Sequence, residues 1–338
     1  MIINAPAQSI RVVLKLALAV AVIGPAITIT TALSVESRDS LSPLPAPSAL
    51  NMGKVELGRK LFHDPILSKK QTLSCSTCHD LAAGGTVHSK RTTGYDGKMH
   101  EFNSTTVFNV GNNYRLGWRG RFTSLTLQNE KILLDENLMA NSWEVLLPRL
   151  NAMNSYSTSF QTMYGVPPNR ENVLDALSEF QRSLSTPNAP FDLYLMGDSN
   201  ALDPQQKRGY ELFLKIGCVS CHQGSNIGGN MFQLFGVFAN PSERTHSSPT
   251  SFDWQPSDLD GTDNIFRVPS LRNVEVTAPY FHDGSADTLA EAVAVMGKSQ
   301  LGRELTDSDI KTIVEFLKSL TGEYNGERLK SAPVQPAK

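Results

Sequence analysis

Every cysteine in this 338-residue chain lies in one of two copies of the motif Cys-x-x-Cys-His, at residues 75–79 and 218–222. Two thiols three positions apart can form thioethers with the two vinyl groups of one haem, and the histidine that follows then lies under the iron as a ligand. A redox-active pair of thiols or half of a zinc site uses the same cysteine spacing, but neither needs a histidine after both pairs. The sequence therefore predicts two covalently bound c-type haems, haem 1 at Cys75, Cys78 and His79 and haem 2 at Cys218, Cys221 and His222.

The start of the chain has the pattern of a secretory signal. Basic residues precede an uncharged, mostly apolar run at residues 16–33, and Ser34 fits a cleavage site. We expect residues 1–34 to be a signal peptide, or an uncleaved membrane anchor, since a run of this length is at the lower limit for spanning a bilayer. Residues 35–51 then form a Pro-rich linker. Export places the protein in the periplasm, the compartment in which bacteria attach c-type haem.

The charge balance excludes one class of partner. The chain has 31 Lys and Arg residues against 33 Asp and Glu residues, which gives a formal net charge of −2. Such a chain lacks the basic field that binds phosphates, so we expect no nucleic-acid partner. Four cysteines are also too few for a disulfide-based fold at this length.

Apolar residues recur at helical spacing from Met52 onward, and convincing alternating strands are absent. Spacing and capping residues predict helices at 172–184, from Asp203-Pro204 onward, from Asp287 to Gly297, and from Thr306 to Gly322. The small residues and prolines at 185–190 are the best domain boundary. We therefore predict a mainly α fold of two cytochrome c-like helical domains, each with one covalent haem, at 52–186 (haem 1) and 187–325 (haem 2), followed by a tail at 326–338.

The sixth ligand of each iron separates electron transfer from reaction chemistry, because methionine or histidine there closes the iron and an open position admits a small substrate. Spacing alone chooses none of the candidates. For haem 2 they are Met231, His246, His282 and Met296, and for haem 1 they are His88, Tyr95, Met99 and His100.

From Met52 to Gly322 the chain resembles the bacterial di-haem cytochrome c peroxidases, to which the MauG-type protein-oxidising enzymes are related. The segments that carry the resemblance in the first half are 57–62, 74–79, 103–109 and 118–121. Those in the second half are 217–222, 266–273, 277–284 and 296–297.

The resemblance implies roles for individual residues. It makes haem 1 the peroxidatic haem and haem 2 the electron-entry haem, with Met296 as the axial ligand of haem 2. It implies a Ca²⁺ site between the haems at Asn103, Thr277 and Pro279, whose oxygen ligands suit a hard cation. Trp118 falls on a tryptophan between the haems and Gln128 on a glutamine of the distal pocket. The implied partners are H2O2 and a small donor, a cytochrome c or a cupredoxin, and family members are often homodimers.

Two positions depart from the family pattern. Tyr95 stands where the family commonly has a histidine that ligates haem 1 in the resting enzyme, so haem 1 is five-coordinate, or Tyr95 binds as phenolate, or Tyr95 only lines the pocket. Leu138 stands where the family has its catalytic glutamate, and leucine cannot move the proton that peroxide cleavage requires. Glu136 could replace it if the loop is shifted, and His88 or His100 could enter the pocket from the other side.

Three functions are compatible with these residues. The leading hypothesis is an exported peroxidase that takes electrons through haem 2 and reduces H2O2 at haem 1. The second is a MauG-like maturase that uses peroxide to oxidise Trp or Tyr side chains of a protein substrate. The third is a di-haem electron carrier.

Overall fold

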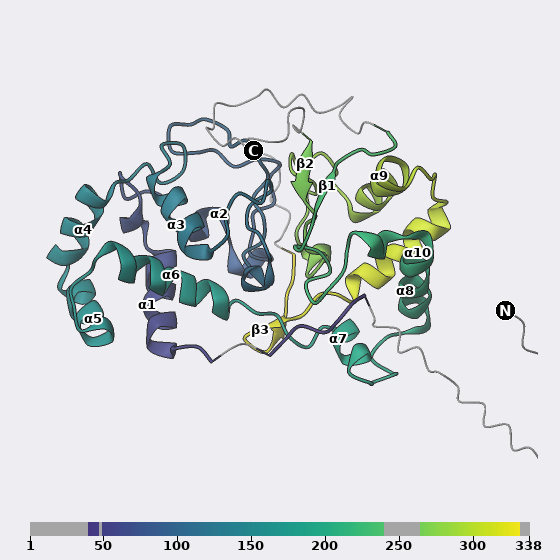
Figure 1. Cartoon of the computed structure of the whole chain (residues 1–338), viewed down its shortest axis with the longest axis horizontal. Coiled ribbons are helices and arrows are strands. Elements are labelled where there is room, and N and C mark those ends of the chain that lie inside the picture. Colours follow the sequence, from purple (N-terminus) through teal and green to yellow (C-terminus); the bar gives the residue numbers. More distant parts are fainter. Residues whose placement is uncertain (1–39, 47–48, 240–263, 332–338) are drawn as a thin grey trace, which may run out of the picture. The chain divides into compact units, whose positions relative to one another are not determined.

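A computed structural model describes residues 40–46, 49–239 and 264–331, and the predicted signal peptide lies outside these ranges. The described fold is mainly helical (Figure 1), and none of its helices is long and apolar enough to cross a membrane. The first half contains α1 (Met52–His63), α2 (Cys75–Cys78), α3 (Leu125–Leu134), α4 (Trp143–Ala152), α5 (Asn154–Tyr164) and α6 (Arg170–Ser183). The second half contains α7 (Pro190–Leu195), α8 (Pro204–Ile216), α9 (Leu289–Leu301) and α10 (Asp307–Lys318).

The strands are short and form two antiparallel pairs. Strand β1 (Phe232–Leu234) pairs with β2 (Ile265–Arg267), with Phe232 opposite Arg267. Strand β3 (Glu323–Tyr324) pairs with β4 (Glu327–Arg328). The predicted scarcity of strands and the mainly α fold are thus confirmed for the described residues.

Each half is built on one close helix crossing at a glycine. In the first half α1 crosses α6, and a Cβ on Gly58 would run into the backbone carbonyl of Ala176 and meet the Phe180 Cβ at 2.7 Å. In the second half α8 crosses α10, and a Cβ on Gly209 would run into the carbonyl of Thr312 and meet the Phe316 Cβ at 2.7 Å. The same contact pattern in both halves agrees with a repeated structural unit, one for each Cys-x-x-Cys-His motif.

The capping residues predicted for two helices are confirmed. Thr306 caps α10 in a capping box with Asp309, and Asp203 caps α8 by accepting hydrogen bonds from the backbone of Gln205 and Gln206 at 2.7 and 2.8 Å. These side chains satisfy backbone N–H groups that a helix start leaves without partners. Helix α6 begins two residues earlier than predicted, because Asn169 and Asn172 form its capping box.

The predicted bounds of α9 are wrong. Its N-cap is Thr288 and not Asp287, and the helix continues through Gly297 to Leu301. Gly297 does not end the helix, because it serves packing instead: a Cβ there would meet Leu305 Cγ at 2.7 Å. The stop is Gly302, whose φ of +63° lies in the left-handed region that glycine adopts without strain.

A buried hydrogen-bonded junction joins the two halves at the predicted boundary. Asn109 Nδ2 donates to Thr186 Oγ1 at 2.7 Å, and the Thr186 N–H donates to Asn109 Oδ1 at 2.9 Å. Asn273, which has the equivalent place in the second half, donates to the same Thr186 Oγ1 at 3.0 Å. Thr186 therefore connects the loops that follow the haem motif in both halves.

Both ends of the described chain pack into a core. Leu41, within the predicted linker, is buried in the core of the second half, and Leu329, within the predicted tail, is buried in the core of the first half. A buried ion pair anchors the N-terminal segment, since Arg272 lies 2.7 Å from Asp192 and also donates to the Ser42 carbonyl at 3.1 Å.

Replacing Gly58 by alanine is expected to destabilise the protein by at least about 1–3 kcal/mol, because the added methyl group overpacks the crossing against a backbone carbonyl that cannot move aside. Gly53→Ala in the same helix is the control, since its methyl group meets only the flexible end of Met163 and the helix propensity improves. Denaturant unfolding of the haem-loaded proteins measures both changes. Equal stabilities of the two variants would contradict the assigned crossing.

Candidate functional site

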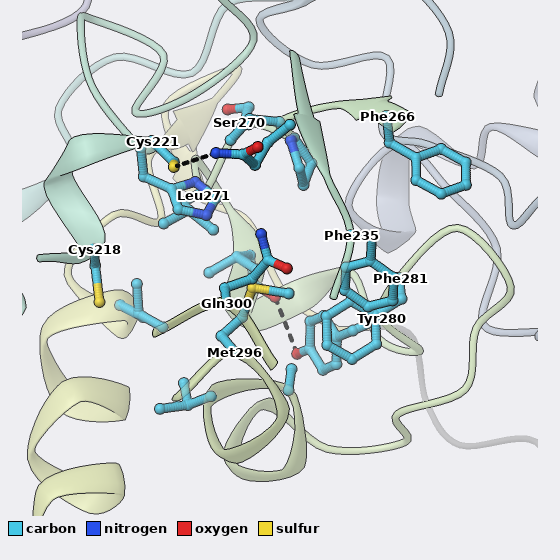
Figure 2. Close-up of a pocket in the computed structure, with 18 of the residues that line it drawn as sticks. Cys218, Cys221, Phe235, Phe266, Ser270, Leu271, Tyr280, Phe281, Met296 and Gln300 are labelled. Atoms are coloured by element: carbon cyan, nitrogen blue, oxygen red, sulfur yellow. Dashed lines mark hydrogen bonds between the residues drawn. The ribbon is translucent and has the colours of Figure 1, made fainter. Parts of the chain in front are cut away.

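The second half contains a cavity of about 510 Å³ that we call the haem 2 cavity. Both thiols and the histidine of the second motif, together with Met296, are part of its wall. Figure 2 shows Cys218 and Cys221 at one side and Met296 pointing in from α9, with Phe235, Tyr280 and Phe281 around them. A largely apolar cavity with two thiols, an imidazole and a thioether in its wall fits a covalently attached haem.

The two motif histidines are held in the same way. His79 Nδ1 lies 3.3 Å from the Gly85 carbonyl, and His222 Nδ1 lies 3.3 Å from the Ile227 carbonyl. A carbonyl is only an acceptor, so each Nδ1 carries the proton and each Nε2 is left with its lone pair for a metal. Burial lowers the pKa of both histidines, that of His222 to about 4, so both rings are neutral at physiological pH. Neutral imidazole is the form that ligates iron.

The cysteines lack the properties of a redox pair. Burial raises the pKa of Cys75 and of Cys218 to about 12 and also raises that of Cys78. A catalytic thiol pair instead has a lowered pKa, because the thiolate is the nucleophile. Within the described ranges no group of three or more His, Cys, Asp and Glu side chains is placed to hold a metal ion. The thiol-redox and zinc interpretations therefore find no support in the geometry.

The structure separates the four candidate sixth ligands of haem 2. Met296 and His282 line the haem 2 cavity, whereas Met231 does not. The Met231 sulfur instead lies 3.8 Å from the Gln223 side-chain nitrogen, which donates to it. His246 lies outside the described residues.

Residues of the first half complete the wall of the haem 2 cavity. Trp118 lines it, donates from Nε1 to the Asn103 carbonyl at 2.8 Å, and meets the His282 ring edge to face at 6.4 Å. Asn103, Thr277 and Pro279 line the same cavity. Trp118, which the family resemblance places between the haems, therefore reaches the haem 2 cavity from the first half.

Two family descriptions match the chain in succession. Residues 52–200 match the family described as "Di-haem cytochrome c peroxidase", and residues 206–321 match "Cytochrome c". The "Cytochrome c551 peroxidase" of Nitrosomonas europaea is 36% identical over 298 residues, 88% of each chain. The protein of the same name from Pseudomonas aeruginosa is 37% identical over 271 residues, 79% of this chain and 78% of its own. The chain belongs to the di-haem cytochrome c peroxidase family.

A solved structure gives this di-haem peroxidase a close fold match. It is described as "a MauG-like protein associated with microbial copper homeostasis", with a TM-score of 0.72 and 25% identity over 83% of this chain and 93% of that one. Membership makes the chain an oxidoreductase of the peroxidase type that carries haem c in two cytochrome c-like domains. The predicted family, fold class and enzyme class are confirmed.

One of the two departures from the family pattern, Tyr95, lines a second cavity, of about 490 Å³, in the first half of this di-haem peroxidase. Cys75, Cys78 and His79 do not line it. Tyr95 and Glu136 both line this cavity, which we call the Tyr95 cavity, and Leu138 does not. The Tyr95 hydroxyl is buried, and within the described ranges no group forms a hydrogen bond with it. Its ring faces the Lys70 ammonium group at 4.9 Å. Gln128, on α3, lines neither cavity.

His100 joins the two loops that form the Tyr95 cavity. Its Nδ1 lies 2.7 Å from Thr92 Oγ1 and its Nε2 lies 3.2 Å from the Asn137 carbonyl, which also accepts the Tyr95 N–H at 3.0 Å. Both ring nitrogens thus have protein partners, so His100 is a structural clamp in this geometry. The sequence named His100 as a possible ligand of haem 1 and as a possible substitute for the missing glutamate. It did not predict the clamp, because the spacing from 100 to 137 carries no signal of the contact.

Replacing both Cys218 and Cys221 by serine is expected to leave the second half without a stable fold. The unfilled cavity of about 510 Å³ would cost about 12 kcal/mol at 24 cal/mol per Å³, as large as the whole stability of a typical domain. Limited proteolysis and circular dichroism measure this loss. Ser220→Ala, an exposed change between the two thiols, is the control and should behave like the wild type. A fully folded double variant without haem would contradict the prediction.

Proposed function

We propose that this protein is an exported peroxidase that reduces H2O2 to two molecules of water, with two electrons and two protons, at the haem held by Cys75, Cys78 and His79. The observation that carries the proposal is the difference between the two sites. The thioether sulfur of Met296 lines the haem 2 cavity. In the first half a phenol and a carboxylate line the Tyr95 cavity, although Cys75, Cys78 and His79 do not line it. Bound haem supplies one-electron redox chemistry and, where its iron has an open position, the place at which peroxide is reduced.

We assign Met296 as the residue that would ligate the iron of haem 2 together with His222. The assignment is supported by its position in α9, from which the side chain points into the cavity that contains both thiols of the motif (Figure 2). A histidine and methionine pair gives a closed iron with a high reduction potential. The site then serves electron entry and does not bind substrate.

Glu136 is assigned as the acid and base that moves a proton between the two oxygens of peroxide. It lines the Tyr95 cavity together with Tyr95, and it replaces the glutamate whose place is taken by Leu138. Tyr95 is assigned to the cavity wall, where its buried hydroxyl can donate to a bound oxygen atom. Gln128, on α3, does not line the Tyr95 cavity, and we keep for it the distal-pocket role at haem 1 that the family resemblance implies.

Trp118 is assigned as the relay between the sites. Its support is the hydrogen bond to the Asn103 carbonyl, which fixes the indole in the wall of the haem 2 cavity while its backbone belongs to the first half. A large π-system held in one orientation shortens the electron path between two haems.

The Ca²⁺ site is assigned to Asn103 Oδ1 and to the carbonyls of Thr277 and Pro279. Asn103 Nδ2 donates to the carbonyls of Ser89 and Lys90 at 3.1 and 3.2 Å, which directs Oδ1 the other way. In the described part of the chain no donor binds Oδ1 or either carbonyl. Three oxygens without donors on the wall of one cavity suit a hard cation that completes its shell with water.

The partners and location follow from the leader and from the closed haem 2. We propose a periplasmic protein, processed at or anchored by its N-terminus, that accepts electrons from a small cytochrome c or cupredoxin and forms a homodimer. The alternative function is that of a MauG-like maturase acting on a partner protein. Tyr95 in place of the usual histidine favours it, and one solved relative is described as MauG-like. Met296 favours the peroxidase.

Glu136→Gln is expected to lower kcat for H2O2 about 100-fold or more, because the amide cannot transfer the proton. The measurement is steady-state turnover with reduced cytochrome c. Glu144→Gln is the control, since this exposed carboxylate on α4 lies outside the cavity and should leave kcat unchanged. An unchanged kcat in Glu136→Gln rejects the assignment, and a wild-type protein without any turnover rejects the peroxidase function.

Tyr95→Phe is expected to leave the electron paramagnetic resonance and optical spectra of ferric haem 1 unchanged, because the hydroxyl lines the cavity and does not bind iron. The as-isolated ferric haem 1 should be high-spin, as an iron with an open position requires. Loss of a phenolate-to-iron charge-transfer band in Tyr95→Phe would instead show that Tyr95 is a ligand.

A further inference from the structure

Arg267 is a buried cation in the wall of the haem 2 cavity. It ends β2, only 5% of its surface is exposed, and it lines the same cavity as Cys221 and His222. Its Nε donates to the Gly117 carbonyl at 3.0 Å. Its Nη1 is buried and has no hydrogen-bond partner in the described part of the chain.

The charge of Arg267 is not balanced by the protein. No carboxylate of the described residues forms an ion pair with it, and burial alone lowers its pKa to about 10. Arg272 is as deeply buried and its Nη1 also has no hydrogen-bond partner, but its charge is balanced by Asp192, which lies 2.7 Å from its guanidinium group. A buried guanidinium that stays charged at neutral pH without a counter-ion is costly, so an anion is expected at Nη1.

An anion can reach Arg267 Nη1 from the haem 2 cavity. On the protein side the backbone of Gly229 approaches so closely that a Cβ there would lie 3.6 Å from Nη1 and would collide with the Asn113 side chain. The chain neighbours of Arg267 are Phe266, whose ring stacks on His282 at 4.2 Å, and Val268, both of which line the cavity.

We propose that Arg267 is the counter-ion of a propionate carboxylate of haem 2. Haem carries its own carboxylates, and attachment to Cys218 and Cys221 places the ring in the cavity that Arg267 lines. The guanidinium fork can bind a carboxylate with two parallel hydrogen bonds. The proposal requires haem at the second motif and does not depend on the reaction that haem 1 performs.

The same residue fixes Trp118 in the wall of the haem 2 cavity. The Arg267 N–H donates to the Trp118 carbonyl at 2.8 Å, and its side chain holds the preceding residue, Gly117. Arg267 is therefore a positioning residue that ties the propionate, the indole and the two halves together. Its positive charge also favours the ferrous state of haem 2, because reduction adds a negative charge nearby.

The test is the midpoint potential of haem 2 in Arg267→Gln, measured by spectroelectrochemistry between pH 5 and pH 8 without peroxide. In the wild type the propionate stays ionised, and the potential should not change with pH. Without the cation the pKa of the buried carboxylate rises and its protonation couples to reduction. The potential of the variant should then fall below that of the wild type at high pH, with a slope approaching about 59 mV per tenfold change in proton concentration.

Two further variants make the result specific. Arg303→Gln removes the same charge from an exposed position of the second half and should leave the potential and its pH dependence unchanged. Arg267→Lys keeps the charge, so the midpoint potential of its haem 2 should not change with pH. This variant tests the proposal even if Arg267→Gln does not fold. An Arg267→Gln protein with full haem content and a wild-type potential at every pH overturns the proposal, as does an Arg267→Lys protein whose potential depends on pH. Loss of peroxidase turnover alone would bear on the proposed function and not on this pairing.

Discussion

The close helix crossings at Gly58 and Gly209 are the contacts on which the rest of the structure depends. A glycine lets the backbones of α1 and α6, and of α8 and α10, approach to the point where a methyl group would strike a carbonyl. The two helices of each pair pack against each other in their own half of the chain (Figure 1). The Cys-x-x-Cys-His motif follows the first helix of each pair, so its thiols and histidine are presented beside that pair.

The two halves are a single working unit. Thr186 binds the corresponding asparagines of both halves, and Trp118 and Asn103 of the first half complete the wall of the haem 2 cavity. Electron transfer between two haems depends steeply on distance and orientation. A buried junction and a shared wall hold the two halves together, which an exposed flexible linker between two domains would not do.

Burial controls the chemical state of each group in the site. It lowers the pKa of both motif histidines, which leaves them neutral for iron, and it raises the pKa of the Cys75, Cys78 and Cys218 thiols, which disfavours thiolate chemistry. Burial also makes the charge of Arg267 costly, because a charge in a low dielectric needs a partner of opposite sign. Arg272 pairs with Asp192 and anchors a chain segment, whereas for Arg267 we propose a carboxylate of the cofactor as the partner.

The sequence by itself determined the haem chemistry, the family and most of the helical framework. The motif at 75–79 and 218–222, the caps at Asp203 and Thr306, and the helical spacing are local signals, and local signals are readable from one chain. Tertiary structure decided what depends on distant contacts. Gly297 proved to be a packing glycine and not a stop because its neighbour is Leu305, beyond the end of the helix. Glu136 and not Leu138 shares a cavity with Tyr95, and Arg267 is buried away from every described carboxylate, because the fold brings together loops far apart in the chain. Packing determines which side chains share a cavity, and the order of residues along the chain does not show which ones they are.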